Sequence, residues 1–237
     1  MRIDKFISSC GVASRKEAAV AAKRGLVTLD GVPVRDLSQH IDPAASVVCF
    51  EGRRLVWRRY TYIMMNKPAG VVSSTDEPGD RTVIDLLDAE LQRIGLFPCG
   101  RLDRDTTGLL LITNDGDTAH RLLSPKKHAG KKYRFSVDLP LPSGAEALFA
   151  SGMTIDGGEL CLPATLECDP DRLGGVLTLT EGKFHQVKRM IAALGSTVVS
   201  LRRESFGPLV LDPSLSEGEW RLLSDREIAL LPTSNKN

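Results

Sequence analysis

The segment Gly100–Thr113, GRLDRDTTGLLLIT, sets charged side chains directly before an apolar run. If its first residues are extended, Arg101, Asp103 and Asp105 point to one side of the chain. The run LLLIT is typical of a buried strand, and Thr106–Gly108 predicts a turn before it. A carboxylate held in a cleft beside a cation stays ionised and can act as a nucleophile. The alternative is a solvated loop tip, so the chemistry depends on a cation from elsewhere in the chain.

A second charged segment, EGKFHQVKRMIAALG (181–195), offers that cation and is patterned as a helix. On a helical wheel its apolar stripe consists of Val187, Met190, Ile191 and Leu194. Lys188 lies on the flank of this stripe and can reach a cleft, whereas Arg189 lies on the far side and should be solvated or bind phosphate. Lys183 precedes the helix and is free to meet an anion there. The alternative is a merely amphipathic surface helix.

Positive charge is concentrated at the N-terminal end of the 237-residue chain. Residues 1–60 hold 11 Lys and Arg against 6 Asp and Glu, a charge of +5, whereas residues 61–237 hold 20 against 24, a charge of −4. The spacing of apolar residues predicts two short helices before Gly25 and a hairpin in LVTLDGVPV. The basic residues that crowd the helical pair are Arg2, Lys5, Arg15, Lys16, Lys23 and Arg24. They indicate a surface for a polyanion, or else a basic face that is only solvated.

The stretches MRIDKFIS, SRKEA and GLVTLDGVPV resemble the S-four-like RNA-binding domain over residues 1–50. The resemblance implies a small α/β module that presents basic residues to structured RNA. The RNA-binding residues that we expect here are Arg2, Lys5, Arg15 and Lys16. The basic stretch EGRRLVWRRY would connect this module to the rest of the chain. We therefore predict two domains, residues 1–58 and residues 59–237.

The larger part of the chain is patterned as an α+β domain. Apolar runs typical of strands dominate it, and helices interrupt them without regular alternation, which favours a mixed, largely antiparallel sheet. Five cysteines without CxxC spacing and four unpaired histidines predict no metal site. No apolar run approaches the ~20 residues of a membrane span, and the first residues lack the apolar core of a signal peptide. We expect a cytoplasmic protein that meets no membrane.

Four motifs occur in order along the chain, namely NKPAGVVSS, GRLDRDTTGLLLITNDG, KKY and EGKFHQVKRM. Together they resemble the pseudouridine synthases, in particular the RsuA-like branch that acts on small-subunit ribosomal RNA. The resemblance covers nearly the whole chain. It implies the pseudouridine-synthase fold, conversion of uridine to pseudouridine in ribosomal RNA, and no cofactor. One departure is Gly130, where the family more often has an acidic residue, and it touches no catalytic position.

The same resemblance assigns roles to single residues. It implies that Asp103 is the catalytic aspartate, Arg101 the arginine beside it that binds RNA, Tyr133 the active-site tyrosine and Lys188 the basic partner of the aspartate. Lys183 remains a rival for that last role, and both nucleophilic attack and elimination remain open as routes. The implied partner is ribosomal RNA, naked or within a partly assembled small subunit, and the protein is expected to be a monomer.

Three other functions share parts of this pattern. An aspartate-nucleophile hydrolase, such as a phosphatase, would need metal-binding carboxylates or a phosphate loop near Asp103, and the sequence has neither. A non-catalytic ribosome-assembly factor could use the same basic surfaces, but it would not need Asp103, Tyr133 and Lys188 together. A synthase for large-subunit RNA would carry looser forms of the motifs, and the details of SPKKH and FHQVKRM favour the small-subunit branch.

Overall fold

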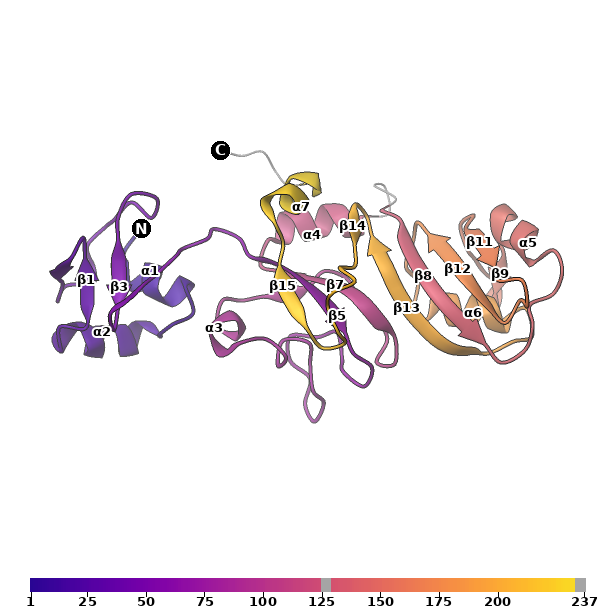
Figure 1. Ribbon diagram of the computed structural model, residues 1–237, viewed down its shortest axis with the longest axis horizontal. Coiled ribbons are helices and arrows are strands. Elements are labelled where there is room, and N and C mark those ends of the chain that lie inside the picture. Colours follow the sequence, from indigo (N-terminus) through magenta and orange to yellow (C-terminus); the bar gives the residue numbers. More distant parts are fainter. Residues whose placement is uncertain (125–128, 233–237) are drawn as a thin grey trace. The chain divides into compact units, whose positions relative to one another are not determined.

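The computed structural model describes residues 1–124 and 129–232, and most of the segment SPKKH lies outside them. The chain forms two compact units, which we describe separately (Figure 1). The first comprises Met1–Thr61 with Ile84–Phe97, and the second comprises Tyr62–Val83 with Pro98–Asn237. The sequence analysis did not foresee that residues 84–97 pack with the first unit. The functional boundary between residues 58 and 59 stays a prediction.

The first unit combines the two expected helices with a small sheet. Helices α1 (Ile3–Ser9) and α2 (Arg15–Lys23) pack against a sheet of order β2-β1-β3-β4. Its strands are β1 (Val27–Leu29), β2 (Val32–Pro33), β3 (Val48–Phe50) and β4 (Arg53–Arg54). Ser14 begins α2 with a capping box, in which its hydroxyl accepts from the Glu17 amide at 3.2 Å. The stripe of Ile3, Phe6 and Ile7 is buried in the core, as the spacing predicted.

The second unit is built on a mixed nine-stranded sheet, whose main path is β11-β12-β8-β13-β7-β5-β15 (Figure 1). The strands of this path are β5 (Tyr62–Lys67), β7 (Thr107–Thr113), β8 (Lys131–Val137), β11 (Thr165–Cys168), β12 (Gly174–Leu179), β13 (Val198–Phe206) and β15 (Trp220–Leu222). Short β14 (Leu209–Val210) pairs with β13, and β6 (Phe97–Pro98) pairs with β7. Along the path only β7 and β13 pair in parallel among the described strands. The sheet is therefore mixed and largely antiparallel, as expected.

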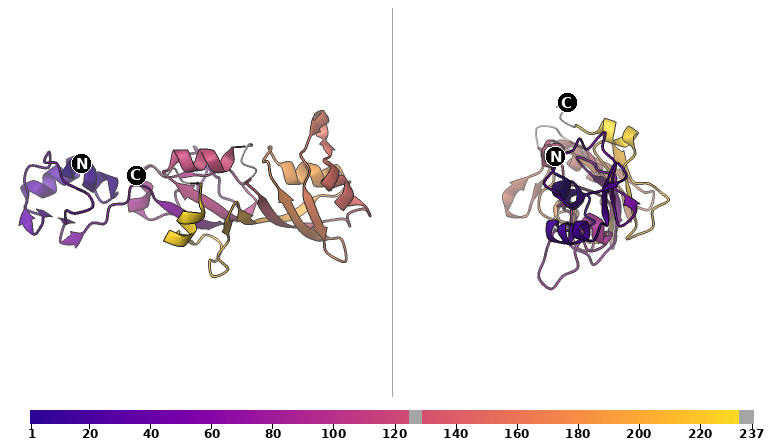
Figure 2. Two further views of the ribbon diagram at one scale, coloured as in Figure 1. Left: turned by 90° about the horizontal axis from the view of Figure 1, so that it is seen from above. Right: turned by 90° about the vertical axis from the view of Figure 1, so that its left-hand side faces the viewer.

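The helices of this unit are short, and most connect neighbouring parts of the sheet. They are α4 (Gly116–Leu123), α5 (Ala145–Ser151), α6 (Gln186–Ala192) and α7 (Asp225–Leu230). Figure 2 shows α4 and α6 on one side of the sheet. A small hairpin of β9 (Thr154–Ile155) and β10 (Glu159–Leu160) contacts α6. The remaining helix, α3 (Ala89–Gln92), belongs to the first unit and is only four residues long.

Two strands carry the motifs of the site on their ends. Strand β5 ends at Lys67 because Pro68 follows, and β7 begins at Thr107. The predicted turn at Thr106–Gly108 is wrong, since the turn lies at residues 104–105 and Gly108 is already in the strand. This glycine serves close approach, because a Cβ there would lie 2.3 Å from the carbonyl oxygen of Arg203 on β13.

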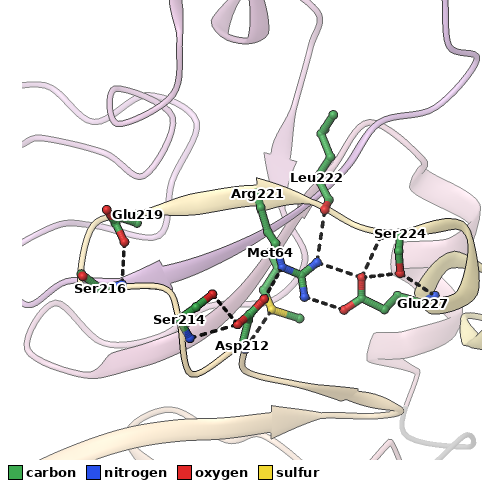
Figure 3. Close-up of polar contacts among 9 residues, drawn as sticks. All are labelled: Met64, Asp212, Ser214, Ser216, Glu219, Arg221, Leu222, Ser224 and Glu227. Carbon is green, nitrogen blue, oxygen red and sulfur yellow. Dashed lines mark hydrogen bonds and ion pairs between the residues drawn. The ribbon is translucent and has the colours of Figure 1, made fainter.

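A cluster of ion pairs around Arg221 joins β15 to the last helix (Figure 3). Nε of Arg221 donates to Asp212 at 2.6 Å, and its two terminal nitrogens donate to the Glu227 carboxylate at 2.8 Å each. Glu227 also accepts from the Ser224 amide and completes the cap of α7. Arg221 lowers the pKa of Glu227 to about 2, and Ser214 with Arg221 lowers that of Asp212 to about 2. Every nitrogen of this guanidinium thus has a partner.

Within residues 1–124 and 129–232 no helix is long and apolar enough to cross a membrane. Over the same ranges no group of three or more His, Cys, Asp and Glu could hold a metal ion. The five cysteines are free thiols.

Candidate active site

A cavity of about 510 Å³ lies in the second unit. The loop before β7, the start of α6 and the strands β8 and β13 supply its walls. Asp103, Tyr133 and His185 line it together with Lys131 and Arg203. The motifs GRLDRD, KKY and EGKFHQVKRM, which are far apart in the sequence, therefore meet around one cavity.

Lys188 contacts both carboxylates of the GRLDRD loop. Its Nζ lies 3.3 Å from Oδ2 of Asp103 and donates to the two oxygens of Asp105 at 2.6 and 2.9 Å. Burial opposes the charge of Lys188, whose side chain is 27% exposed, but its bonds and charge interactions with Asp105 and Asp103 outweigh burial and raise its pKa. Hydrogen bonding to Lys188 in turn lowers the pKa of Asp105. The lysine is a charged bridge between the loop and α6.

The loop itself is a turn and not the extended segment considered above. The Thr106 amide donates to the Asp103 carbonyl at 3.1 Å, and this turn brings both carboxylates to Lys188. Leu102 is buried, and its amide and carbonyl both bond to the Ser73 hydroxyl at 3.1 and 3.0 Å. The backbone on each side of Asp103 is therefore fixed.

Lys67, the lysine of NKP, is fully buried beneath this loop. Its Nζ donates to the carbonyl oxygens of Pro68, Arg104 and Thr106 at 2.9, 3.2 and 3.0 Å. Burial lowers the pKa of Lys67 to about 8, although the charges of Asp105 and Asp103 oppose the shift. The NKP motif alone did not predict this role for Lys67. The available signal was a lysine that ends an otherwise apolar strand.

Tyr133 and Arg203 form a cross-strand pair on β8 and β13, so their side chains emerge on the same face of the sheet. Both are buried, and both line the cavity. Nε of Arg203 donates to the Leu109 carbonyl at 2.8 Å. Tyr133 was expected at the site and Arg203 was not, because nothing in LRRESF distinguishes the buried arginine from its partly exposed neighbour Arg202.

Residues at the start of α6 form the rim of the cavity beside Asp103. Phe184 is 77% exposed, and its ring stacks on His185 with centroids 3.8 Å apart. His185 has a left-handed backbone with a φ of 48°, and its Nε2 lies 3.6 Å from Oδ1 of Asp103. Neither residue was expected at the site. The left-handed conformation cannot be read from the residue types around it.

Lys183 and Arg189 face acidic residues of the β9–β10 segment. Lys183 lies 3.0 Å from Glu159 and donates to the Leu160 carbonyl at 2.7 Å. Arg189 lies 2.7 Å from Asp156 and 2.8 Å from Glu159, and its side chain is only 22% exposed. The expectations of a free Lys183 and a solvated Arg189 are therefore wrong, because a segment distant in sequence neutralises both. Lys188, and not Lys183, is the lysine beside Asp103.

The other basic residues named from the sequence are accessible. Arg101 is exposed at the cavity. In the first unit, Arg2 is exposed and pairs with Asp4 at 2.8 Å. Lys5, Arg15 and Lys16 are also exposed on the two helices. Their positions suit phosphate contact, and their role in RNA binding stays a prediction.

Comparison with known proteins identifies the family to which the motifs around this cavity belong. Residues 61–193 match the family of RNA pseudouridylate synthases, and residues 1–47 match the S4 domain. The chain belongs to the RNA pseudouridine synthases, enzymes of the isomerase class, and carries an N-terminal S4 domain. The expected family is thereby confirmed.

Two relatives and one solved structure cover almost the whole chain. It is 44% identical to "Uncharacterized RNA pseudouridine synthase YtzG" of Bacillus subtilis, over 98% of each chain. It is 43% identical to "Ribosomal small subunit pseudouridine synthase A" of Vibrio cholerae, over 97% of this chain and 98% of the relative. A crystal structure of a pseudouridylate synthase matches with a TM-score of 0.68 and 40% identity, over 97% of this chain and 98% of that one. The pseudouridine-synthase fold is confirmed by this match.

Proposed function

We propose that this protein converts one uridine of small-subunit ribosomal RNA to pseudouridine, with Asp103 as the catalytic carboxylate. The observation that carries the proposal is the contact of 3.3 Å between Asp103 and Lys188 at a cavity that Tyr133 also lines. The choice of small-subunit RNA rests on the relatives of that name, which are 41–43% identical to this chain over nearly its full length.

The reaction sets specific demands on these side chains. The bond between N1 of uracil and C1′ of ribose breaks, a bond between C5 and C1′ forms, C5 loses a proton and N1 gains one. Asp103 either attacks C1′ or removes a sugar proton, and both routes use its carboxylate. Lys188, whose Nζ lies 3.3 Å from Oδ2 of Asp103, offsets the negative charge of that carboxylate. Product and substrate are isomers, so the chemistry consumes no co-substrate.

The remaining roles concern the base and the RNA. The target uridine must leave its stack, at a cost of about a few kcal/mol. We assign Arg101 to the space that the uridine leaves in the base stack, or to the neighbouring phosphates. We assign Tyr133 to contact with the face of the detached uracil and to proton loss from C5. Tyr133 suits this role because it is buried at the cavity, where its flat ring can stack on the detached base while the base turns to present C5 to C1′.

RNA binding is assigned to exposed basic residues of both units. Arg2, Lys5, Arg15 and Lys16 would contact phosphates through the S4 domain, where the charge of +5 for residues 1–60 is concentrated. Lys183 and Arg189 would do so only by leaving Glu159 and Asp156, so their share should be small. We further propose that the protein works as a monomer in the cytoplasm, on naked RNA or on a partly assembled small subunit.

Mapping pseudouridines in ribosomal RNA tests this proposal. RNA is compared from cells with the intact gene, without it, and with the Asp103→Asn variant in its place. We expect one small-subunit pseudouridine to disappear in the second and third strains. Loss of a large-subunit pseudouridine would assign the enzyme to the other substrate. An unchanged map would make the protein a non-catalytic RNA-binding factor.

A further inference from the structure

Arg203 is a buried cation whose bonding capacity is not used up. Its side chain is 1% exposed, and within the described residues Nε bonds only to the Leu109 carbonyl. Its Nη2 is buried and has no hydrogen-bond partner among residues 1–124 and 129–232. The carbon of its guanidinium lies 4.9 Å from the ring centroid of Phe206, which provides a face but no charge.

A second cation lies close by and is equally without a counter-ion. Lys131 is half-buried, its Nζ donates to the Ala129 carbonyl at 3.3 Å, and it lies 5.6 Å from the same Phe206 ring. Among the described residues no carboxylate forms an ion pair with Lys131 or Arg203. The wall of the cavity formed by β8 and β13 therefore carries two positive charges that form no ion pair among the described residues, and Glu181, which also lines the cavity, offsets the charge of Lys131 only from a distance.

Such an arrangement is unfavourable unless something else binds to it. A buried charge without a partner destabilises the folded protein, and a buried donor without an acceptor adds to that cost. The hydrogen bond to the Leu109 carbonyl accounts for Nε. It does not account for the buried positive charge, because a neutral donor would bond to that carbonyl equally well. Arg203 lines a cavity that also contains Asp103 and Tyr133, and its unpartnered Nη2 points to a ligand with an anionic or strongly polar oxygen.

The proposed reaction produces such a ligand. When the bond between N1 and C1′ breaks, its electron pair stays on uracil, whether Asp103 attacks C1′ or assists elimination. The detached base is an anion whose charge is shared by N1 and the two carbonyl oxygens. It exists until C5 bonds to C1′, C5 loses its proton and N1 gains one.

We propose that Arg203 is a further catalytic residue, whose Nη2 donates to a carbonyl oxygen of the uracil anion while the base is detached from the sugar. The inference rests on the proposed function and is independent of the route that Asp103 takes. Lys131 adds positive potential on the same wall. Preorganised donors of this kind stabilise developing charge most effectively where water is excluded.

The test uses the acidity of the leaving base. Fluorine at C5 withdraws electrons, so the anion of 5-fluorouracil is more stable than the anion of uracil. It therefore depends less on stabilisation by a donor of the protein. We would measure single-turnover loss of the target nucleotide in RNA that carries uridine or 5-fluorouridine at that position, using the intact protein and its Arg203→Gln variant. We expect the variant to lose about 100-fold with uridine, as for removal of one donor from an oxyanion site, and clearly less with 5-fluorouridine.

Matched variants separate chemistry from folding. Arg202→Gln removes the adjacent charge, which is partly exposed and lies 3.5 Å from Glu217, and should change neither rate by more than about twofold. Arg203→Lys keeps the charge, so it should fold where Arg203→Gln fails, and should show a smaller loss with the same preference for the fluorinated base. Equal losses on both substrates in a folded Arg203 variant, or full activity, would overturn this inference alone. An intact protein that forms no pseudouridine would overturn the proposed function and this inference with it.

Discussion

Arg221 and Arg203 lie in the same unit, and they use the same side chain in opposite ways. All three nitrogens of Arg221 have acceptors, from Asp212, Glu227 and the Leu222 carbonyl (Figure 3). Arg203 is far more buried, yet within the described residues its Nη2 has no acceptor and no carboxylate neutralises its charge. A cluster whose donors all have acceptors stabilises the fold, whereas a buried charge without an acceptor can bind a ligand. We therefore expect variants of the first kind to change stability and those of the second to change activity.

The largest effect within this contrast is expected for Lys188→Met. The change removes the cation that touches both Asp103 and Asp105 and leaves a good helix former on the flank of α6. Single-turnover pseudouridine formation at saturating enzyme should fall about 100-fold or more, with little change in melting temperature. Lys188→Arg should retain more activity because the charge remains. Lys183→Met is the matched control. If Lys183→Met lost activity and Lys188→Met kept it, Lys183 and not Lys188 would be the basic partner of Asp103.

Arg221→Met should show the opposite profile. It removes three hydrogen bonds that join β15 to α7 and Asp212, so the melting temperature should fall by a few degrees while single-turnover activity below the transition stays near that of the intact protein. The pKa of Glu227 is lowered to about 2, so its contribution to stability is present above about pH 4.5 and is lost as the pH falls toward 2. The free energy of unfolding of the variant should therefore depend less on pH over that acid range. An unchanged acid profile would show that the cluster does not contribute to stability.

The basic face of the S4 domain should affect affinity and not chemistry. Replacing Lys5, Arg15 and Lys16 by Gln removes three exposed charges. The slope of log affinity for RNA against log salt should become shallower by about 0.7–0.9 for each lost phosphate contact, while single-turnover rate at saturation is retained. Arg226→Gln, an exposed charge on α7, is the control. Equal slopes for all proteins would remove this face from RNA binding.

The last expected effect is confined to alkaline pH and concerns Lys67, which is as buried as Arg203 but, like Arg221, has hydrogen-bond acceptors for its charged group. Its pKa is lowered to about 8 in the folded protein, below the 10.5 of an ordinary lysine. Between these values the unfolded chain binds more protons, so this group makes stability rise with pH, and its penalty is fully present below pH 8. The free energy of unfolding should rise more steeply from pH 8 to 10.5 in the intact protein than in Lys67→Met, by up to about 1.4 kcal/mol per pH unit. Parallel curves would contradict the lowered pKa.

Local patterns in the sequence predicted the parts of the molecule that local chemistry determines. The two short helices before Gly25, the apolar stripe of α6 and the position of Lys188 on its flank follow from residue types at short spacing. The motif order predicted the family, which the comparisons confirm, and the strand-like apolar runs predicted the mixed, largely antiparallel sheet. The domain boundary and the catalytic roles remain predictions.

What the sequence could not provide depends on contacts between distant segments. The acids that bind Arg189 come from the β9–β10 segment, and the strand that requires Gly108 is β13, nearly a hundred residues away. For the same reason the burial of Arg203 was not predictable, since it and its partly exposed neighbour Arg202 are identical in type. Pairing and burial are properties of the assembled sheet and not of either segment.

The most direct test of the account is single-turnover pseudouridine formation by Asp103→Asn, measured beside Asp105→Asn. Both variants remove one carboxylate from Lys188, and the amide keeps the shape of each side chain. The account predicts that Asp103→Asn forms no pseudouridine while it binds RNA within a few-fold of the intact protein, and that Asp105→Asn remains active at a reduced rate. Formation of pseudouridine by Asp103→Asn at near the intact rate would contradict the assignment of Asp103 as the catalytic carboxylate.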